Sequence, residues 1–382
     1  IPEGSVLVAG YINPSDAMFI TQKKLKGIVT IEGGKHSHLA ILANTYGIPF
    51  VYGIENIDKI IKTNDTVIVD GNSGTIYVNP DEVVLHVFNE QIKDLEEENS
   101  HLAKFKGKTA TTKDGVKINI NANIGNVEEG FLAFEDGADG IGLFRSEFLF
   151  MEKADMSEES QFAAYKQVLE TAKEKTVTIR TLDCGGDKII KSPDIIQESE
   201  KNPLLGWRAI RFTLDNTDLF KTQLRALYRA SVFGNLKIMF PLISCHEQVM
   251  SVLKLVKEVQ NQLTQEKIPF DKNVPLGIMI ETPAAALIAD HLAPTVSFFS
   301  IGTNDLTQYT TCVDRENAKV SHLFSEFHPA VIRLIKNTIE AGQNHNIDVS
   351  VCGELAGSIE GAILLVGMGV RTLSVSSRKI NK

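Results

Sequence analysis

The feature that most constrains the fold is an alternation of short apolar runs with longer amphipathic stretches over residues 112–382. The runs are typical of buried β-strands and the stretches of helices. Eight repeats of a strand followed by a helix predict an α/β fold, a closed (β/α)8 TIM barrel. The predicted strands are 117–121, 140–144, 176–182, 237–241, 277–281, 297–302, 348–352 and 372–376.

An open doubly wound sheet is the other fold that this alternation allows. Such a sheet usually carries a G-x-G-x-x-G turn after its first strand. Here the first predicted strand is followed by Ala-Asn-Ile-Gly at 122–125, which does not match that turn. The sequence therefore favours the barrel.

The first part of the chain has the pattern of a smaller α/β domain that precedes the barrel. Apolar runs at 6–10 and 27–31 predict strands with a helix over 14–24 between them. Further strands are predicted at 48–53, 66–71 and 74–80, and a charged helical stretch follows at 82–105. We therefore expect three parts, namely a small domain at 1–87, a helical linker at 88–111 and the barrel at 112–382.

Composition excludes several classes of protein. The formal net charge is −9 at pH 7, which argues against a nucleic-acid partner held by phosphate contacts. No apolar run approaches the ~18 residues of a membrane-spanning helix, and the first residues lack the pattern of a signal peptide. The 4 cysteines are widely spaced, so neither a zinc site nor a disulfide framework is predicted, and a cytoplasmic location is expected.

Arginines recur at one predicted edge of the barrel, where its strands end. They are Arg145, Arg180, Arg208 and Arg315. The carboxyl ends of the parallel strands of a barrel meet at one face, where active sites lie. A guanidinium group matches carboxylate and phosphate oxygens with paired hydrogen bonds. The four arginines together predict a site for a small polyanion, although any one of them alone could equally form a surface ion pair.

Two carboxylates and a thiol fall at the same predicted edge. Glu281 ends the fifth predicted strand, Asp305 follows the sixth and Cys352 ends the seventh. Oxygen ligands from neighbouring strands suit a Mg2+ ion that keeps waters and a substrate phosphate, although these carboxylates could instead pair with the arginines. The thiol could donate a proton or act as a nucleophile, or it could be an inert buried side chain.

Two histidines in the small domain follow a glycine turn. In the segment GGKHSH, His36 and His38 stand at the start of a predicted helix. Backbone N–H groups at such a terminus stabilise a phosphoryl group, so one histidine could be phosphorylated. The i, i+2 spacing is not that of helical metal ligands, and two exposed histidines without a function remain the alternative.

These segments together carry a family resemblance. GGKHSHLAILANTYGIPFV resembles the phosphohistidine motif of the enzymes that use phosphoenolpyruvate (PEP). The barrel motifs of the same superfamily are similar to GADGIGLFRSEFLFM, RTLDCGGDK, NPLLGWRAIRF, GIMIETPAA, FFSIGTNDLTQYT with VDR, and VCGELAG. Within the superfamily, TLDCGGDK and TNDLTQYT with VDR are most similar to the Enzyme I family of the bacterial phosphotransferase system.

The resemblance implies an activity and a role for each site residue. It implies PEP-dependent phosphorylation of a histidine with release of pyruvate, and transfer of the phosphoryl group to the carrier protein HPr for sugar uptake. By the same resemblance His38 is the phosphorylated residue and Cys352 protonates the enolate of pyruvate. The implied PEP ligands are Arg145, Arg180, Arg208, Asn304 and Arg315, and the implied ligands of Mg2+ are Glu281 and Asp305.

The resemblance also implies a homodimer formed through the barrel and a small domain that swivels between its partners. The HPr-binding subdomain and the extreme C-terminus of the family have no counterpart in this sequence. Two alternatives stay open, namely a fragment of a pyruvate phosphate dikinase or PEP synthase, which would require a nucleotide, and a sensor that binds PEP or pyruvate without catalysis.

Overall fold

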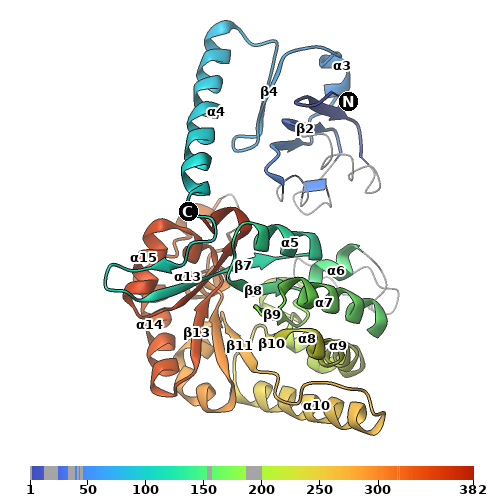
Figure 1. Ribbon diagram of the computed structural model, residues 1–382, viewed down its shortest axis with the longest axis vertical. Helices are drawn as coiled ribbons and strands as arrows, with labels where there is room; N and C mark the ends of the chain where they lie inside the picture. Colours follow the sequence, from blue (N-terminus) through green and yellow to red (C-terminus); the bar gives the residue numbers. More distant parts are fainter. Residues whose placement is uncertain are drawn as a thin grey trace. The chain divides into compact units, whose positions relative to one another are not determined.

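The computed structural model describes residues 2–12, 25–32, 39–40, 43, 46–152, 157–185, 200–315, 317 and 319–382. The chain divides into two compact units, Ile1–Lys104 and Phe105–Lys382 (Figure 1), and each is considered by itself. The predicted helix over 14–24, the segment with His36 and His38, and residues 186–199 lie outside the described residues.

The first unit contains a three-stranded parallel sheet in the order β1-β2-β3 and an antiparallel pair, β4 and β5. The predicted strands of this part of the chain are confirmed. Gly27 lies where a Cβ would come within 2.9 Å of Val69, so the absence of a side chain lets β2 and β4 approach each other. The elements are β1 Val6–Ala9, β2 Gly27–Thr30, β3 Phe50–Tyr52, α3 Ile57–Ile60, β4 Val67–Asp70, β5 Thr75–Val78 and α4 Glu82–Ala103.

The helix predicted at 82–105 is observed as α4, Glu82–Ala103. It begins where the side chain of Asp81 accepts a hydrogen bond from the backbone N–H of Val84 at 2.9 Å. An N-cap of this kind satisfies an N–H group that has no partner inside the helix. No described residue of α4 is buried, so the charged side chains that line it stay in water, as the charge run predicts.

The second unit is a closed barrel of eight parallel strands. Each strand pairs with the next along the chain, and β14 pairs with β7 to close the ring. All eight predicted strands are observed, so the predicted (β/α)8 barrel is confirmed. The strands are β7 Lys117–Ile124, β8 Gly140–Arg145, β9 Thr176–Arg180, β10 Asn235–Phe240, β11 Leu276–Ile280, β12 Phe298–Ile301, β13 Asp348–Val351 and β14 Thr372–Ser376, with β6 Ala110–Thr111 antiparallel to β7.

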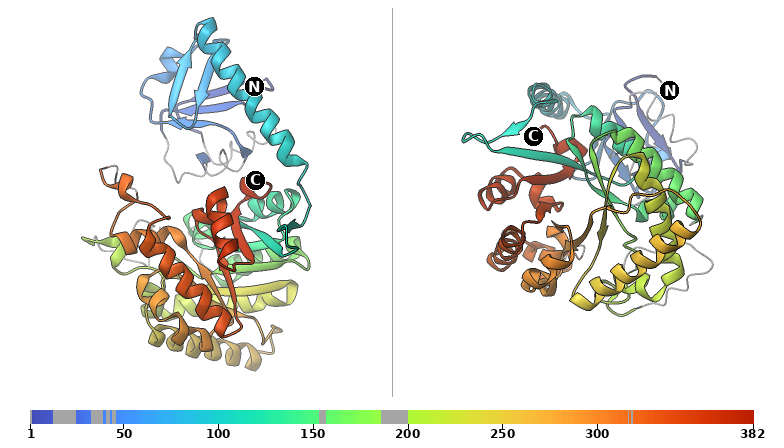
Figure 2. Two further views of the ribbon diagram at one scale, coloured as in Figure 1. Left: turned by 90° about the vertical axis from the view of Figure 1, so that its left-hand side faces the viewer. Right: turned by 60° about the horizontal axis from the view of Figure 1, so that its bottom comes forward.

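Helices surround the strands on the outside, as both views of Figure 2 show for α5, α7, α9, α10, α14 and α15. The helices are α5 Val127–Glu135, α6 Glu147–Glu152, α7 Glu158–Ala172, α8 Ile210–Asp215, α9 Thr217–Ala230, α10 His246–Gln265, α11 Pro283–Leu287, α12 Ala289–Leu292, α13 Thr303–Thr311, α14 Pro329–Asn344 and α15 Ile359–Gly367. In the described part of the chain, none of the helices combines the length and the apolar character needed to cross a membrane.

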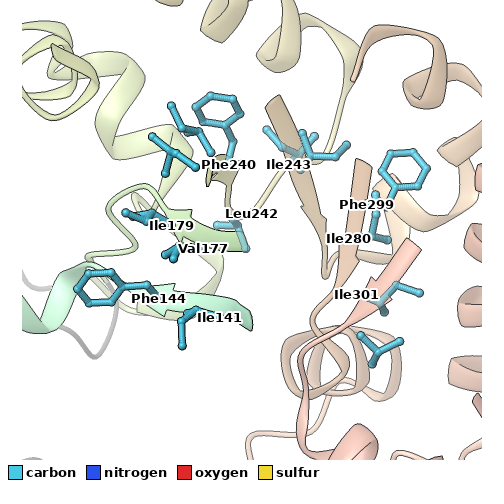
Figure 3. Packing of buried hydrophobic residues seen from close by; sticks show 14 of the residues in the cluster. Ile141, Phe144, Val177, Ile179, Phe240, Leu242, Ile243, Ile280, Phe299 and Ile301 are labelled. Carbon is cyan, nitrogen blue, oxygen red and sulfur yellow. The ribbon is translucent and has the colours of Figure 1, made fainter. Parts of the chain in front are cut away.

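Alternate residues of the strands form two separate apolar layers. Ile179, Phe240 and Ile301 belong to the large cluster between strands and helices, part of which Figure 3 shows. Met239 and Met279, one position earlier on their strands than Phe240 and Ile280, pack in a second, smaller cluster with Leu143, Phe298 and Cys352. Because successive strand residues face opposite sides, the second cluster fills the barrel interior.

The strand β9 ends at Arg180, two residues before the predicted end. Thr181 still donates its backbone N–H to Met239, but the N–H of Leu182 turns to the side chain of Gln223 at 2.8 Å. A side chain therefore replaces the neighbouring strand as hydrogen-bond acceptor, and this ends the ladder just before Asp183.

Candidate active site

The predicted site residues of the second unit follow the carboxyl ends of neighbouring strands. Arg180 is the last residue of β9, Glu281 directly follows β11, and Cys352 directly follows β13. Asp305 lies in the first turn of α13, four residues after the end of β12. Parallel strands of one barrel bring these ends to the same face. The structure thus places four of the predicted residues at one face of the barrel.

Arg180 is buried between two carboxylates. Its Nη2 group forms ion pairs with Glu147 and with Asp183, the latter at 3.0 Å. Its Nη1 group lies 3.7 Å from the sulfur of Met279 in the barrel interior. Burial of a guanidinium is favourable only with such charged partners, and they fix the plane of the group.

Arg208 joins two of the strand ends. Its Nε and Nη2 groups donate to both oxygens of Asp183, at 3.0 and 3.2 Å, and Nη2 also donates to Asp305 at 2.8 Å. Its Nη1 donates to the hydroxyl of Tyr309 at 3.1 Å. Arg315 reaches the other oxygen of Asp305 at 3.4 Å. Three of the predicted arginines are therefore part of one charged cluster.

Arg145 lies next to this cluster. It is paired with Arg180 in the register of β8 and β9, and its guanidinium stacks over Phe148 with the Cζ atom 4.9 Å from the ring centroid. Within the described residues, the buried Nε atoms of Arg145 and Arg180 have no hydrogen-bond partner. A buried donor without an acceptor is unfavourable, so an anionic ligand that supplied oxygens here would be stabilised.

Glu281 is buried beside other carboxylates. Its Oε1 accepts a hydrogen bond from the backbone N–H of Leu242 at 2.6 Å. Burial, together with the negative charges of Asp305 and Asp183, raises its pKa to about 7. Like charges held this close disfavour ionisation unless a cation lies among them. The donor set of Glu281 and Asp305 therefore fits a divalent cation with oxygen ligands.

The number of carboxylates also bears on which cation would fit. Among the described residues, no three His, Cys, Asp or Glu side chains are arranged as ligands of one metal ion. Mg2+ commonly uses only one or two protein carboxylates and takes its other oxygens from water and substrate. Two carboxylates are consequently enough for this type of site.

Cys352 is the thiol of the cluster and is almost fully buried. Its Sγ lies 3.6 Å from the carbonyl oxygen of Ile301, and burial raises its pKa to about 11. Below that pH the group stays a neutral thiol, which can give a proton but is a poor nucleophile.

Asn304 is half-buried and links two loops of the site. Its side-chain oxygen accepts a hydrogen bond from the backbone N–H of Glu354 at 2.7 Å, and its amide group lies 3.4 Å from the Glu354 carboxylate. The loop after β12 is thereby tied to the loop after β13. His36 and His38 lie outside the described residues, so the structure does not test their role.

Several residues of the cluster were not predicted as site residues. Glu147 lies two residues after the end of β8 and Asp183 three residues after the end of β9, a signal similar to the one that identified Glu281. Tyr309 lies one helical turn after Asp305 on α13, within the segment that was already singled out. Attention to every polar residue at a strand end would have found the two carboxylates.

Gln223 gave no such signal, since it lies within α9, far along the sequence from the strand ends it contacts. It is buried, its side-chain oxygen accepts from Leu182, and its amide group donates to Ser146 at 3.1 Å and to Tyr165 at 2.9 Å. Ser146 in turn donates to the carbonyl oxygen of Arg180 at 2.7 Å. Gln223 therefore holds the backbone at Leu182 directly and at Arg180 through Ser146.

Comparisons with known proteins identify the family of the chain. Residues 99–382 match the family described as PEP-utilising enzyme, PEP-binding domain, and residues 1–74 match the mobile domain of PEP-utilising enzymes. A phosphoenolpyruvate-protein phosphotransferase of Buchnera aphidicola is 44% identical over 378 residues, which are 99% of this chain and 66% of the relative. That of Haemophilus influenzae is 42% identical over 99% of this chain and 65% of its own length. The chain thus spans slightly less than two thirds of the length of these relatives.

A solved structure that is similar in part is a HpcH/HpaI aldolase/citrate lyase family protein from Burkholderia cenocepacia J2315. It has a TM-score of 0.45 and 14% sequence identity, and covers 73% of this chain and 93% of its own. The PEP-binding domain match covers the whole barrel unit, and the mobile domain match precedes it in the order that the sequence motifs predict. The chain belongs to the family of PEP-utilising enzymes.

Proposed function

We propose that the chain transfers the phosphoryl group of PEP to His38 and releases pyruvate, and that the phosphoryl group then passes to HPr. The observation that carries the proposal is the buried cluster of arginines, carboxylates and a thiol at the carboxyl ends of the barrel strands. The names of the curated relatives support the same reaction. Their greater length makes the activity of this chain a question for experiment.

The arginines would hold the substrate by its charges. PEP carries a phosphate and a carboxylate, and both groups match the paired donors of a guanidinium. Arg145 and Arg180 offer buried Nε donors that lack a partner among the described residues, and Arg315 offers a partly exposed guanidinium beside Asp305. We assign these three arginines, together with Arg208 and Asn304, to PEP binding.

Glu281 and Asp305 would hold the divalent cation, which we propose is Mg2+. When bound, such a cation neutralises charge on the phosphoryl group and on the leaving oxygen. The residues contribute to this by their placement. Glu281 is oriented by the backbone N–H of Leu242, and Asp305 by Arg208, so both carboxylates are held in place before a cation binds.

The transfer itself balances without a further reactant. The imidazole of His38 forms a bond to phosphorus while the bond from phosphorus to the enol oxygen breaks, and the imidazole loses a proton to solvent. The enolate of pyruvate takes a proton at its methylene carbon from the Cys352 thiol, and solvent returns that proton to the sulfur. A thiol kept neutral by burial is available as this acid at neutral pH.

The proposal also requires the part of the chain with His38 to approach the barrel during turnover, with residues 88–111 as the linker. We retain the proposals that HPr is the acceptor and that the barrel forms a homodimer. A dikinase fragment would need a nucleotide, and a sensor would bind PEP without forming pyruvate.

The first test is the amount of pyruvate formed from PEP and Mg2+ without nucleotide. Without HPr each chain can react once, so the proposal predicts a burst of about one pyruvate per chain. A chain with His38→Ala should give no burst while still binding PEP in a calorimeter. A burst that depends on a nucleotide would instead support the dikinase fragment, and PEP binding with no burst would support the sensor.

A further inference from the structure

Glu326 connects two loops of the site and has no part in the mechanism above. It lies between the short helical turn Ser321–Leu323 and α14. Its Oε1 accepts a hydrogen bond from the hydroxyl of Thr303, the first residue of α13, and another from the backbone N–H of Leu355 at 3.1 Å. One carboxylate oxygen thus holds the loop after β12 and the loop after β13.

The two loops are in close contact at this point. A Cβ at Gly353 would overlap the side chain of Thr303, so the backbones can approach only because residue 353 is glycine. Thr303 is fully buried and Leu355 nearly so, whereas Glu326 is half-buried, so the two hydrogen bonds are partly shielded from water. Exchange of these bonds for bonds to water is therefore hindered.

The chemistry of the proposed reaction depends on the distance between these loops. Asp305 lies two residues after Thr303, in the first turn of α13, and Cys352 lies three residues before Leu355. The proton donor is thus carried on one side of the Glu326 bridge and a proposed metal ligand on the other. Asn304 and Glu354 form a second bridge between the same loops, but that bridge is exposed.

We infer that Glu326 is a positioning residue that holds Cys352 in register with the loop of Asp305, so that the thiol meets the methylene carbon of the bound enolate. The role in catalysis rests on the proposed function, whereas the effect on the position of Cys352 does not. Since both bonds end on the same oxygen, an amide oxygen at that place would serve as well. Glu326→Gln should therefore keep Cys352 in place, whereas Glu326→Ala should not.

Alkylation of Cys352 by iodoacetamide tests the positioning without any need for activity. The rate is measured for each cysteine by peptide mass spectrometry after the intact 382-residue chain has reacted. We expect Cys352 to react about tenfold faster in Glu326→Ala, which corresponds to about 1.4 kcal/mol in the opening of the loop. In Glu326→Gln the rate should stay within about threefold of the unchanged chain, because the shared acceptor oxygen is kept.

Two controls separate positioning from a general loss of stability. Cys184 is also fully buried in the barrel unit, and its rate should not change. Glu340→Ala removes another glutamate, on the exposed face of α14 where it pairs with Lys336, and should leave Cys352 unchanged. If Glu326→Ala fails to fold, two variants of Thr303 replace it. Thr303→Val removes the hydroxyl that donates to Glu326, whereas Thr303→Ser keeps it. Cys352 should react faster in Thr303→Val and at the unchanged rate in Thr303→Ser.

Three results would overturn the inference, namely an unchanged Cys352 rate in Glu326→Ala, an equal increase at Cys184, or an increase in Glu326→Gln as large as in Glu326→Ala. The pyruvate burst gives the second measurement. Glu326→Ala should slow the burst about tenfold with less than a threefold change in PEP affinity. Glu326→Gln should form pyruvate at nearly the rate of the unchanged chain. A chain that forms no pyruvate at all would contradict the proposed function while the alkylation result still decides the role of Glu326.

Discussion

Replacement of Arg208 by methionine should destabilise the barrel more than any replacement of a surface arginine. The change removes the guanidinium that donates to both oxygens of Asp183 and to Asp305, and keeps an apolar side chain of similar length. Asp183 is fully buried and Asp305 nearly so. Two buried carboxylates are then left with one positive partner fewer.

The size of the effect follows from burial. Removal of one partner from a buried ion pair costs roughly 3–5 kcal/mol, because the remaining charge stays desolvated. For a unit of the size of the barrel each kcal/mol lowers Tm by roughly 2 °C. We therefore expect Arg208→Met to lower the Tm of the barrel by about 6–10 °C.

Arg229 provides a matched control. It also pairs with two carboxylates, Glu158 and Glu159, both at 2.7 Å, but its side chain is 18% exposed whereas that of Arg208 is 4% exposed. The two Arg229 pairs are partly exposed and each contributes at most about 1 kcal/mol, so Arg229→Met should lower Tm by about 4 °C or less, which is smaller than the shift expected for Arg208→Met. Both variants are compared with the unchanged chain by differential scanning calorimetry at neutral pH.

A double variant tests the reason for the effect. Asp183→Asn in the Arg208→Met background removes one of the uncompensated charges and should restore part of the lost stability. Equal shifts of Tm for Arg208→Met and Arg229→Met would refute the argument from burial. A double variant less stable than Arg208→Met would show that the charge left on Asp183 is not the cause of the loss.

Three further outcomes are expected. The Cys352→Ala chain should bind PEP with an affinity within about threefold of the unchanged chain, as measured by calorimetry. It should form pyruvate about 100-fold more slowly or slower still in the burst measurement. An unchanged burst rate would exclude the thiol as the proton donor. Because burial raises the pKa of Cys352 to about 11, its alkylation should rise with pH up to about 11 rather than level off near 9, the ordinary value, and levelling off near 9 would show that the thiol is not buried as described. Gln223→Leu should weaken PEP binding by about tenfold, because Gln223 holds the backbone beside Arg180. Val256→Ala on α10 removes part of another buried side chain and should lower Tm without weakening PEP binding. If both variants lost the same PEP affinity, Gln223 would have a purely structural role.

The barrel could be predicted because its signal is local. Each strand is a short apolar run, as in 277–281, and stands between segments with helical periodicity. Burial on both faces of a parallel strand requires such a run, whatever the rest of the chain does. The same pattern predicted which edge of the barrel carries the charged residues, because that depends only on where each strand ends.

The pairing within the cluster could not be predicted in the same way. Asp183 and Arg208 are 25 residues apart, and Arg208 and Asp305 are 97 residues apart, so their contacts depend on side chains that reach across several strands. The sequence left open whether Asp305 binds a cation or an arginine. The structure shows that it contacts Arg208 and Arg315 and still lies close enough to Glu281 to raise the pKa of that carboxyl.

Gln223 and Glu326 show what local patterns omit altogether. Gln223 occupies a position of α9 where an apolar residue would continue the buried face, and Glu326 lies in a connection outside the regular elements. Their importance comes from backbone groups that would otherwise lack partners, such as the N–H groups of Leu182 and Leu355. These N–H groups require a protein acceptor only in the folded chain, where they are removed from water.

The central claim is that this chain forms a phosphohistidine from PEP, and the mass of the intact chain tests it most directly. The chain is mixed with PEP and Mg2+ in the absence of nucleotide and its mass is measured before and after brief treatment with acid. We expect a gain of one phosphoryl group that is lost in acid and is absent in His38→Ala. No gain in mass despite PEP binding, or a gain that persists in His38→Ala, would contradict it.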